Sequence, residues 1–239
     1  VNHEGVGQCG LERELGSHLR GRDGYQITRK DQSGLVLLTG GGVLKPPRSG
    51  FDARLSLDLN IQTIVEEELD WGLQKFESSC GAVIVLEPKS GDVLAIASRP
   101  HFDLNLRQNM NKSAMHYAVQ GVYEPGSTLK LISTAAALDL GIMSPKTQTY
   151  CHNGYMRIPG GYVRDYKGFK NITLEEVLAK SSNIGAYKIG MRVGTKRYMD
   201  YLRRFGFTRK TGITLSGEEG GWTADPGNGI NFSRITYGY

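Results

Sequence analysis

The chain has 239 residues, of which 39% are hydrophobic and 22% are charged, a globular composition that can bury a core. Its formal net charge is +5, and because Lys and Arg are spread along the sequence, nucleic-acid binding is not indicated. Apolar runs such as residues 35–38 and 82–86 are far shorter than the roughly 18 residues of a membrane-spanning helix.

The three cysteines, Cys9, Cys80 and Cys151, are too widely spaced for a paired disulfide framework or a zinc site. None of the five histidines lies four residues from another. The sequence therefore predicts neither a bound metal nor a metal-dependent reaction.

The first 50 residues are rich in glycine and mixed in character. We expect a short helix over residues 12–19 and a short strand over residues 35–38 that ends at three glycines. Residues 46–50, Pro-Pro-Arg-Ser-Gly, are the clearest break in the chain. We place a domain boundary there, with domains at 1–50 and 51–239.

The next segment predicts a strand, a helix and a hairpin. Residues 54–58 alternate as a strand does, and Asp58 can cap a helix that runs to about Phe76. Residues 81–86 and 92–97 are β-rich runs joined by turn residues, which predicts a hairpin.

The second half of the chain predicts mainly helices, and the whole pattern is of the α+β class. A helix starts at Pro125 and ends at Gly141, with the proline and glycine punctuation usual for helix ends. Thr173 and Glu176 fit a capping box that starts a helix through Ala179. Residues 180–183 interrupt it, and helical spacing continues over 184–193 and 195–205.

The most informative spacing is Ser127-x-x-Lys130. Side chains three residues apart on a helix are neighbours, so Lys130 can accept the Ser127 proton if burial lowers its pKa. Such a pair is an activated serine without a histidine. Taken alone, the tetrapeptide also fits a capping serine beside a surface lysine.

The surrounding segments resemble the class B penicillin-binding proteins, which are cell-wall transpeptidases. Residues 124–130, EPGSTLK, are similar to their active-site segment, and residues 180–185, KSSNIG, to their S-x-N motif. Residues 86–95 and 98–105 resemble the first hairpin of that domain and the segment after it. Residues 10–12 resemble a stretch of the preceding pedestal domain.

This resemblance implies a penicillin-binding transpeptidase fold, similar to that of serine β-lactamases, and divides the chain. Residues 1–50 would be the C-terminal part of the pedestal or dimerisation domain, and residues 51–239 the N-terminal portion of the transpeptidase domain. The family's third motif, K-[ST]-G, lies on a strand that we expect beyond Tyr239. We therefore read the chain as a fragment that is inactive by itself.

The implied activity is D,D-transpeptidation of peptidoglycan stem peptides that end in D-Ala-D-Ala. In this reading Ser127 is the nucleophile, Lys130 is the general base and Ser181 relays the proton to the leaving group. Asn183 would bind the substrate amide, and the Ser127 N–H would be one oxyanion donor. No cofactor is implied.

The implied partners are stem peptides, β-lactam antibiotics, and a membrane glycosyltransferase or other members of the division or elongation machinery. The resemblance also implies a domain outside the cytoplasm, anchored to the membrane by a helix that is not in this sequence. Whether the protein serves septation or elongation stays open.

Two segments depart from the family pattern. His116-Tyr117-Ala118 stands where Asn-Arg-Ala is usual. Lys210-Thr211-Gly212 matches the third motif literally, but residues 211–218, TGITLSGE, fit a structural segment that precedes the catalytic strand. We interpret Lys210 as structural.

Two other functions share this fold. The alternative is a non-catalytic module that senses β-lactams or wall fragments. A serine β-lactamase is the third interpretation, and the pedestal-like first 50 residues count against it.

Overall fold

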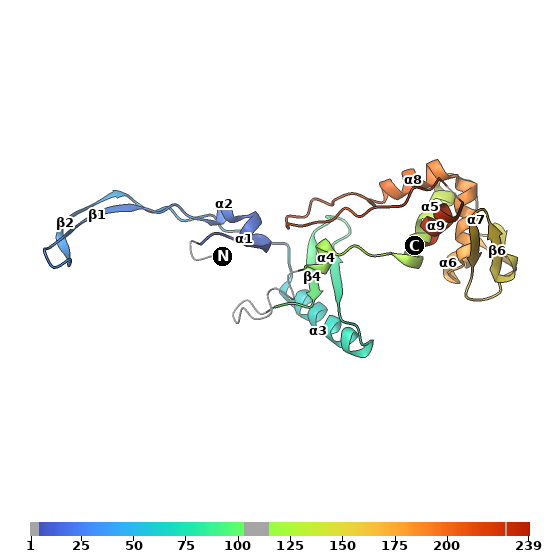
Figure 1. The fold of residues 1–239 in the computed structure, drawn as a ribbon, viewed down its shortest axis with the longest axis horizontal. Helices are drawn as coiled ribbons and strands as arrows, with labels where there is room; N and C mark the ends of the chain where they lie inside the picture. The colour runs from blue at the N-terminus through green and yellow to red at the C-terminus, as the bar shows by residue number, and fades with distance from the viewer. Residues whose placement is uncertain (1–4, 103–114, 228) are drawn as a thin grey trace. The chain divides into compact units, whose positions relative to one another are not determined.

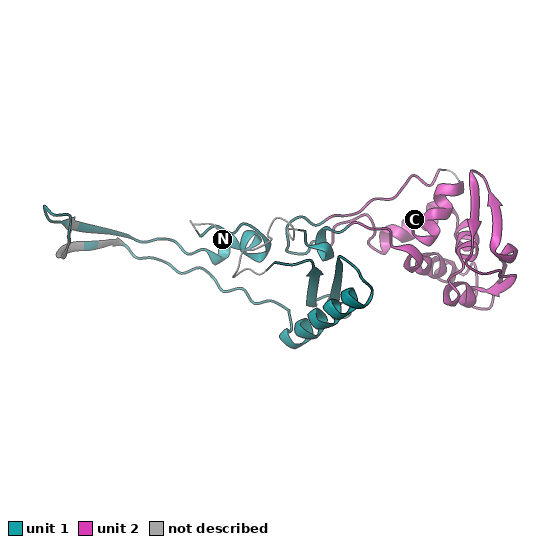
Figure 2. Cartoon of the chain, turned by 60° about the horizontal axis from the view of Figure 1, so that its bottom comes forward, with its two compact units in different colours: residues 1–121, 212–218 teal, residues 122–211, 219–239 magenta. Residues whose placement is uncertain are grey.

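The computed structural model describes residues 5–102, 115–227 and 229–239, which belong to two compact units (Figure 1; Figure 2). Unit 1 comprises Val1–Gly121 and Gly212–Glu218, and unit 2 comprises Val122–Thr211 and Glu219–Tyr239. Both units contain helices and strands, so the predicted α+β class is confirmed. The domain boundary near residue 50 stays a prediction.

The first part of unit 1 holds two short helices and a hairpin. The helix predicted over 12–19 is divided at Leu15 into α1 (Gly10–Glu14) and α2 (Gly16–Leu19). Strand β2 (Val36–Lys45) is longer than predicted because it continues through the glycines and pairs with β1 (Tyr25–Lys30). The sequence pattern alone does not indicate β1.

The rest of unit 1 is built on helix α3 (Leu59–Lys75), strands β3 (Gly81–Leu86) and β4 (Val93–Arg99), and the short helix α4 (Tyr117–Gln120). The Asp58 carboxylate accepts the backbone N–H groups of Asn60 and Ile61, so the predicted cap is confirmed. The predicted hairpin is also confirmed, with β3 antiparallel to β4. Its core consists of Val65, Leu69, Ala95 and Ala97.

The strand predicted over residues 54–58 is wrong. This segment lies beside β4, where the Ser56 hydroxyl donates to the Val93 carbonyl and the Asp58 N–H to the Leu94 carbonyl. These contacts do not make a ladder, so the segment has no regular structure.

In the family-like segment 98–105, residues 103–105 lie outside the described ranges.

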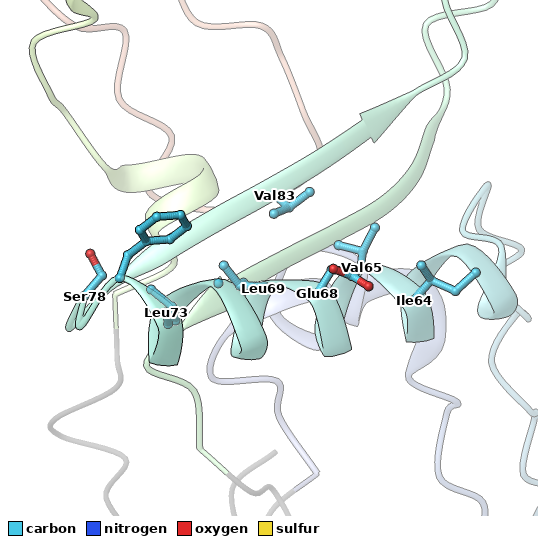
Figure 3. Close-up of a pocket in the computed structure, with 9 residues that line it drawn as sticks. Ile64, Val65, Glu68, Leu69, Leu73, Ser78 and Val83 are labelled. Carbon is cyan, nitrogen blue, oxygen red and sulfur yellow. The ribbon is translucent and has the colours of Figure 1, made fainter.

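A groove of about 370 Å³ lies between α3 and β3 (Figure 3). Ile64, Val65, Leu69, Leu73 and Val83 line it, together with the carboxylate-bearing Glu68. All of these residues belong to unit 1.

Unit 2 is organised around helices α5 (Lys130–Asp139), α7 (Asn183–Val193), α8 (Thr195–Arg204) and α9 (Gly229–Tyr237), with α6 (Leu174–Ala179) leading into α7. Thr173 and Glu176 form the predicted capping box. The core draws on all five helices and includes Ile132, Val177, Ile189, Tyr198 and Phe232. The sequence pattern does not indicate α9.

Four short strands complete unit 2. Strand β5 (Gln148–Tyr150) pairs with β8 (Asn171–Thr173), and β6 (Tyr155–Ile158) pairs with β7 (Gly161–Arg164), all antiparallel. Strands of three or four residues carry too little alternation for a sequence pattern to indicate them. Strand β7 ends at Arg164 and is followed directly by Asp165.

Among residues 5–102, 115–227 and 229–239, every helix is too short or too polar to cross a bilayer.

Candidate active site

Ser127 lies on a 3₁₀ turn, η1 (Gly126–Leu129), that runs directly into α5. The predicted helix is present, but its first turn is 3₁₀ instead of α. Side chains three residues apart are eclipsed in a 3₁₀ helix, so this turn places Ser127 and Lys130 on the same face.

The η1 turn is held against the end of α9 by a contact between two glycines, Gly126 and Gly238. Gly238, at the end of α9, approaches the backbone of Gly126 so closely that a Cβ there would overlap the Gly126 carbonyl. The Gly126 N–H donates to the Gly238 carbonyl at 3.0 Å. Helix α9 therefore helps to fix the residue that precedes Ser127.

The Lys130 amine is buried and faces three oxygens. Only 1% of the residue is exposed. Its Nζ lies 3.1 Å from the Ser127 Oγ, 2.8 Å from the Ser181 Oγ and 2.6 Å from the Ser181 carbonyl oxygen. The interpretation of Lys130 as an exposed surface lysine is therefore wrong.

Burial lowers the pKa of Lys130 to about 8, while the negative charge of Asp165 acts in the opposite direction. Taking an ammonium group out of water disfavours its charged form. Near neutral pH, a minority of the molecules therefore carry a neutral amine with a lone pair for the Ser127 proton.

Ser181 occupies the break between α6 and α7 and completes the group. Its hydroxyl donates to the Ser127 Oγ at 2.9 Å. Its backbone is left-handed, with φ of +53°, a conformation that non-glycine residues rarely adopt. Ser127, Lys130 and Ser181 are thus mutually hydrogen-bonded, although Ser181 is 54 residues from Ser127 in the chain.

Asn183, the fourth predicted site residue, begins α7 next to this trio. Its side-chain amide donates to the Arg164 carbonyl at the end of β7, at 2.8 Å. The role of Asn183 in binding the substrate amide stays a prediction, and in this structure its side-chain amide is bonded to the protein backbone.

Sequence reasoning missed Asp165, which follows β7. Both of its carboxylate oxygens are bonded to the segment that carries Ser181 and Asn183. A lone aspartate after a short strand gives no sequence signal, and only the contacts distinguish it.

Neither departure from the family pattern belongs to the hydrogen-bonded trio of Ser127, Lys130 and Ser181. The His116 Nδ1 lies 3.2 Å from the Ser98 hydroxyl, and burial lowers the pKa of His116. Lys210-Thr211-Gly212 belongs to the irregular segment between α8 and α9 and not to a strand. Its structural role stays a prediction.

No cluster of three or more metal-ligating side chains occurs in the described part of the chain. The three cysteines are free thiols, and Cys151 is buried. The contact of the Lys130 amine with Ser127 and the lowered pKa of Lys130 permit nucleophilic attack by a hydroxyl, with an amine as the proton acceptor.

Comparisons with known proteins agree with this chemistry. A family model described as the penicillin binding protein transpeptidase domain matches residues 81–239. Stage V sporulation protein D of Bacillus subtilis is 34% identical over 89% of this chain and 33% of that protein. The probable peptidoglycan D,D-transpeptidase PbpC of Pseudomonas aeruginosa is 31% identical over 100% of this chain and 43% of its own length.

Solved structures show the same fold. Penicillin Binding Protein 2X from Streptococcus thermophilus superposes with a TM-score of 0.83 at 27% identity, covering 98% of this chain and 35% of that one. A putative peptidoglycan glycosyltransferase from Atopobium parvulum also has a TM-score of 0.83, at 25% identity, covering 100% of this chain and 54% of its own. The chain thus spans less than half the length of the curated relatives quoted above.

Proposed function

This chain belongs to the penicillin-binding protein transpeptidase family, and on that premise we propose that it serves as a serine-type peptidoglycan D,D-transpeptidase. The observation that carries the proposal is the buried Lys130 amine, which lies within hydrogen-bond distance of the hydroxyls of both Ser127 and Ser181. A neutral amine in this position converts an ordinary serine into a nucleophile.

In the proposed acylation, the Ser127 Oγ attacks the carbonyl carbon of the penultimate D-Ala while its proton passes to the neutral Lys130 amine. The C–N bond to the terminal D-Ala then breaks. Ser181 gives its hydroxyl proton to the departing amine and takes up the proton held by Lys130, since its hydroxyl bridges Lys130 and Ser127. An acceptor amine later attacks the ester, forms the cross-link and returns the proton to Ser127.

β-Lactams fit the same step because they present a strained amide to the serine. Ring opening forms the Ser127 ester, but the leaving nitrogen stays attached to the adduct. The acyl-enzyme therefore persists, and it provides a direct test of the nucleophile.

Asn183 is proposed to bind the substrate amide. In the structure its side chain is bonded to the Arg164 carbonyl, so the role requires its amide to exchange this partner for substrate. The Ser127 N–H is proposed as one oxyanion donor, and the second would come from the third-motif strand that we expect beyond Tyr239.

The wider setting is also a proposal. Residues 1–50 would belong to a pedestal domain, and the catalytic unit would lie outside the cytoplasm on a membrane-anchored protein. Its partners there would be stem peptides, a glycosyltransferase and other cell-wall synthesis proteins. Relatives named FtsI and MrdA are described as peptidoglycan D,D-transpeptidases, which supports a role in peptidoglycan synthesis.

The test is mass spectrometry after incubation with a penicillin, on a protein that contains these residues and the expected third-motif strand. Trypsin separates residues 113–130 from residues 181–188, and fragmentation within the first peptide distinguishes Ser113 from Ser127. We expect one adduct, on Ser127, and none in the Ser127→Ala variant. An adduct on Ser181 or Ser182 would contradict the assignment.

A further inference from the structure

Asp165 holds the segment that carries Ser181 from outside the trio of reacting groups. Its Oδ2 accepts the Ser182 hydroxyl at 2.7 Å, and its Oδ1 accepts the Ile184 N–H at 3.0 Å. These partners lie 17 and 19 residues away in the chain, so the contact is tertiary and not a local turn.

The end of β7 makes a third bond to the same segment. The Arg164 carbonyl accepts the Asn183 amide at 2.8 Å. The Asp165 N–H in turn donates to the Gly154 carbonyl, which ties this end of the hairpin to the loop before β6. Residues 182, 183 and 184 are therefore each bonded to one of two consecutive residues, Arg164 or Asp165.

The site of attachment is the beginning of helix α7. Ser182 is the N-cap of this helix, its hydroxyl accepts the Gly185 N–H at 2.9 Å, and the residue is fully buried. A carboxylate is stabilised at a helix N-terminus because the first N–H groups lack partners within the helix. Asp165 thus completes the cap that Ser182 begins.

Ser181 requires such support because its left-handed backbone is unfavourable for a serine. In that conformation the Ser181 hydroxyl contacts both Ser127 and Lys130. The Ser181 carbonyl oxygen also accepts a hydrogen bond from Lys130. Strained conformations of this kind persist only where the surrounding structure fixes them.

We propose that Asp165 is a positioning residue for acylation, which holds the Ser181 hydroxyl between Lys130 and Ser127 through its bonds to Ser182 and Ile184. The proposal rests on the proposed function, since Ser127 acylation is the reaction that it supports. The hydrogen bonds of the Asp165 carboxylate go to Ser182 and Ile184, so it acts on the reacting groups through the Ser181 segment.

The charge of Asp165 has a second effect that can be measured separately. It raises the pKa of Lys130 against the lowering caused by burial. The other groups at the Lys130 amine are the Ser127 hydroxyl and the hydroxyl and carbonyl of Ser181. Burial and Asp165 raise the pKa of the nearby Cys151 thiol, so Cys151 adds no charge near neutral pH.

Three variants separate positioning from charge. Asp165→Asn keeps the size and one acceptor oxygen but loses the charge. Ser182→Ala keeps the charge and loses one of the two bonds. Asp165→Ala loses the charge and both hydrogen bonds. Asp139→Asn is the matched control, because Asp139 is an exposed residue at the end of α5 whose carboxylate accepts the Tyr201 hydroxyl.

The experiment measures penicillin acylation of these variants by stopped flow from pH 6 to 10, in the protein that carries the third-motif strand. We expect Asp165→Ala to lose roughly 10²-fold in rate, the scale of an ångström-level misplacement of a reacting group. Asp165→Asn should retain most of the high-pH rate and shift the pH midpoint downward. Ser182→Ala should slow the reaction with the midpoint unchanged, and Asp139→Asn should match the wild type.

Near-wild-type acylation by Asp165→Ala would overturn the proposal, as would a rate loss explained entirely by the unfolded fraction measured by circular dichroism. If the wild type itself is not acylated on Ser127, the proposed function fails, and NMR still tests the geometry. The Lys130 amine resonance should titrate at lower pH in Asp165→Asn than in Asp139→Asn. An identical titration would contradict the placement of Asp165.

Discussion

Lys130 and Ser181, which are 51 residues apart, are joined twice: the amine donates to the Ser181 carbonyl at 2.6 Å and contacts its hydroxyl at 2.8 Å. A carbonyl can only accept, so this contact uses one N–H of the amine. In the neutral amine, the second N–H then faces the Ser181 hydroxyl, and the lone pair is left for the Ser127 proton. The pair therefore orients the base as well as burying it.

Acylation should increase with pH and level off above a midpoint near 8. Burial lowers the pKa of Lys130 to about 8 from its ordinary 10.5, and only the neutral form can accept the Ser127 proton. Stopped-flow rates with a penicillin that does not titrate in this range measure the midpoint. A rate that is independent of pH from 6 to 10 would contradict the role of Lys130 as base.

The same shift makes the free energy of unfolding depend on pH. Because the folded pKa lies below the unfolded value, the folded state binds fewer protons between about 8 and 10.5. The contribution of Lys130 to stability is therefore fully present above about 10.5 and is lost as the pH falls through about 8. Denaturant unfolding of wild type and Lys130→Met should show a pH-dependent difference in this window only.

Lys130→Arg should slow acylation by roughly 10²–10⁴-fold, the usual contribution of a general base. Arginine keeps the charge but does not deprotonate at accessible pH, so it cannot take the Ser127 proton. Stopped-flow acylation measures the loss, and circular dichroism checks the fold. Because the Lys130 side chain is buried, Lys130→Met provides a second variant that avoids burying a guanidinium group. Near-normal acylation by either variant would exclude Lys130 as the base.

Ser181→Ala and Ser181→Gly should lose acylation to a similar extent and differ in stability. Both remove the hydroxyl that bridges Lys130 and Ser127, but only glycine adopts the observed φ of +53° without strain. We expect Ser181→Gly to be more stable than Ser181→Ala by about 1 kcal/mol, within the range for left-handed residues. Urea unfolding of the pair measures the difference, and equal stabilities would mean that the segment relaxes.

Gly185→Ala should destabilise unit 2 by about 1–3 kcal/mol, as overpacking of a core does. Gly185 is a buried residue of helix α7, and a Cβ there would meet the Cγ2 and Cγ1 atoms of Val177 at 2.5 and 2.7 Å. Gly194→Ala cannot serve as the control, because Gly194 has a φ of +87° and an alanine there would be strained for a different reason. The double variant Gly185→Ala/Val177→Ala should recover part of the loss if the clash is its cause.

Lys210→Ala should leave acylation within a few-fold of wild type. Lys210 belongs to an irregular segment between α8 and α9, and we expect the third-motif lysine on a strand beyond Tyr239. The measurement is the acylation rate of Lys210→Ala by stopped flow, compared with the rates of the wild type and of Lys130→Arg. A loss as large as that of Lys130→Arg would mean that Lys210-Thr211-Gly212 is the third motif.

Features that depend on neighbours in the chain could be predicted from the local pattern of residues. The Asp58 cap of α3, the β3–β4 hairpin and the capping box of Thr173 and Glu176 involve contacts over a few residues or a short turn. The spacing of Ser127 and Lys130 is of the same kind. Such features follow from helix and turn geometry, which the local sequence specifies.

Features that need a distant partner could not be predicted in this way, because they depend on how the chain packs. The four strands of unit 2 are too short to be indicated by alternation and exist through pairing, as β5 does with β8. Ser181 reaches Ser127 only because α6 and α7 pack on α5, and the role of Asp165 depends on bonds 17 and 19 residues away. The lowered pKa of Lys130 is of this second kind, because desolvation is a property of the packed core and not of any local pattern.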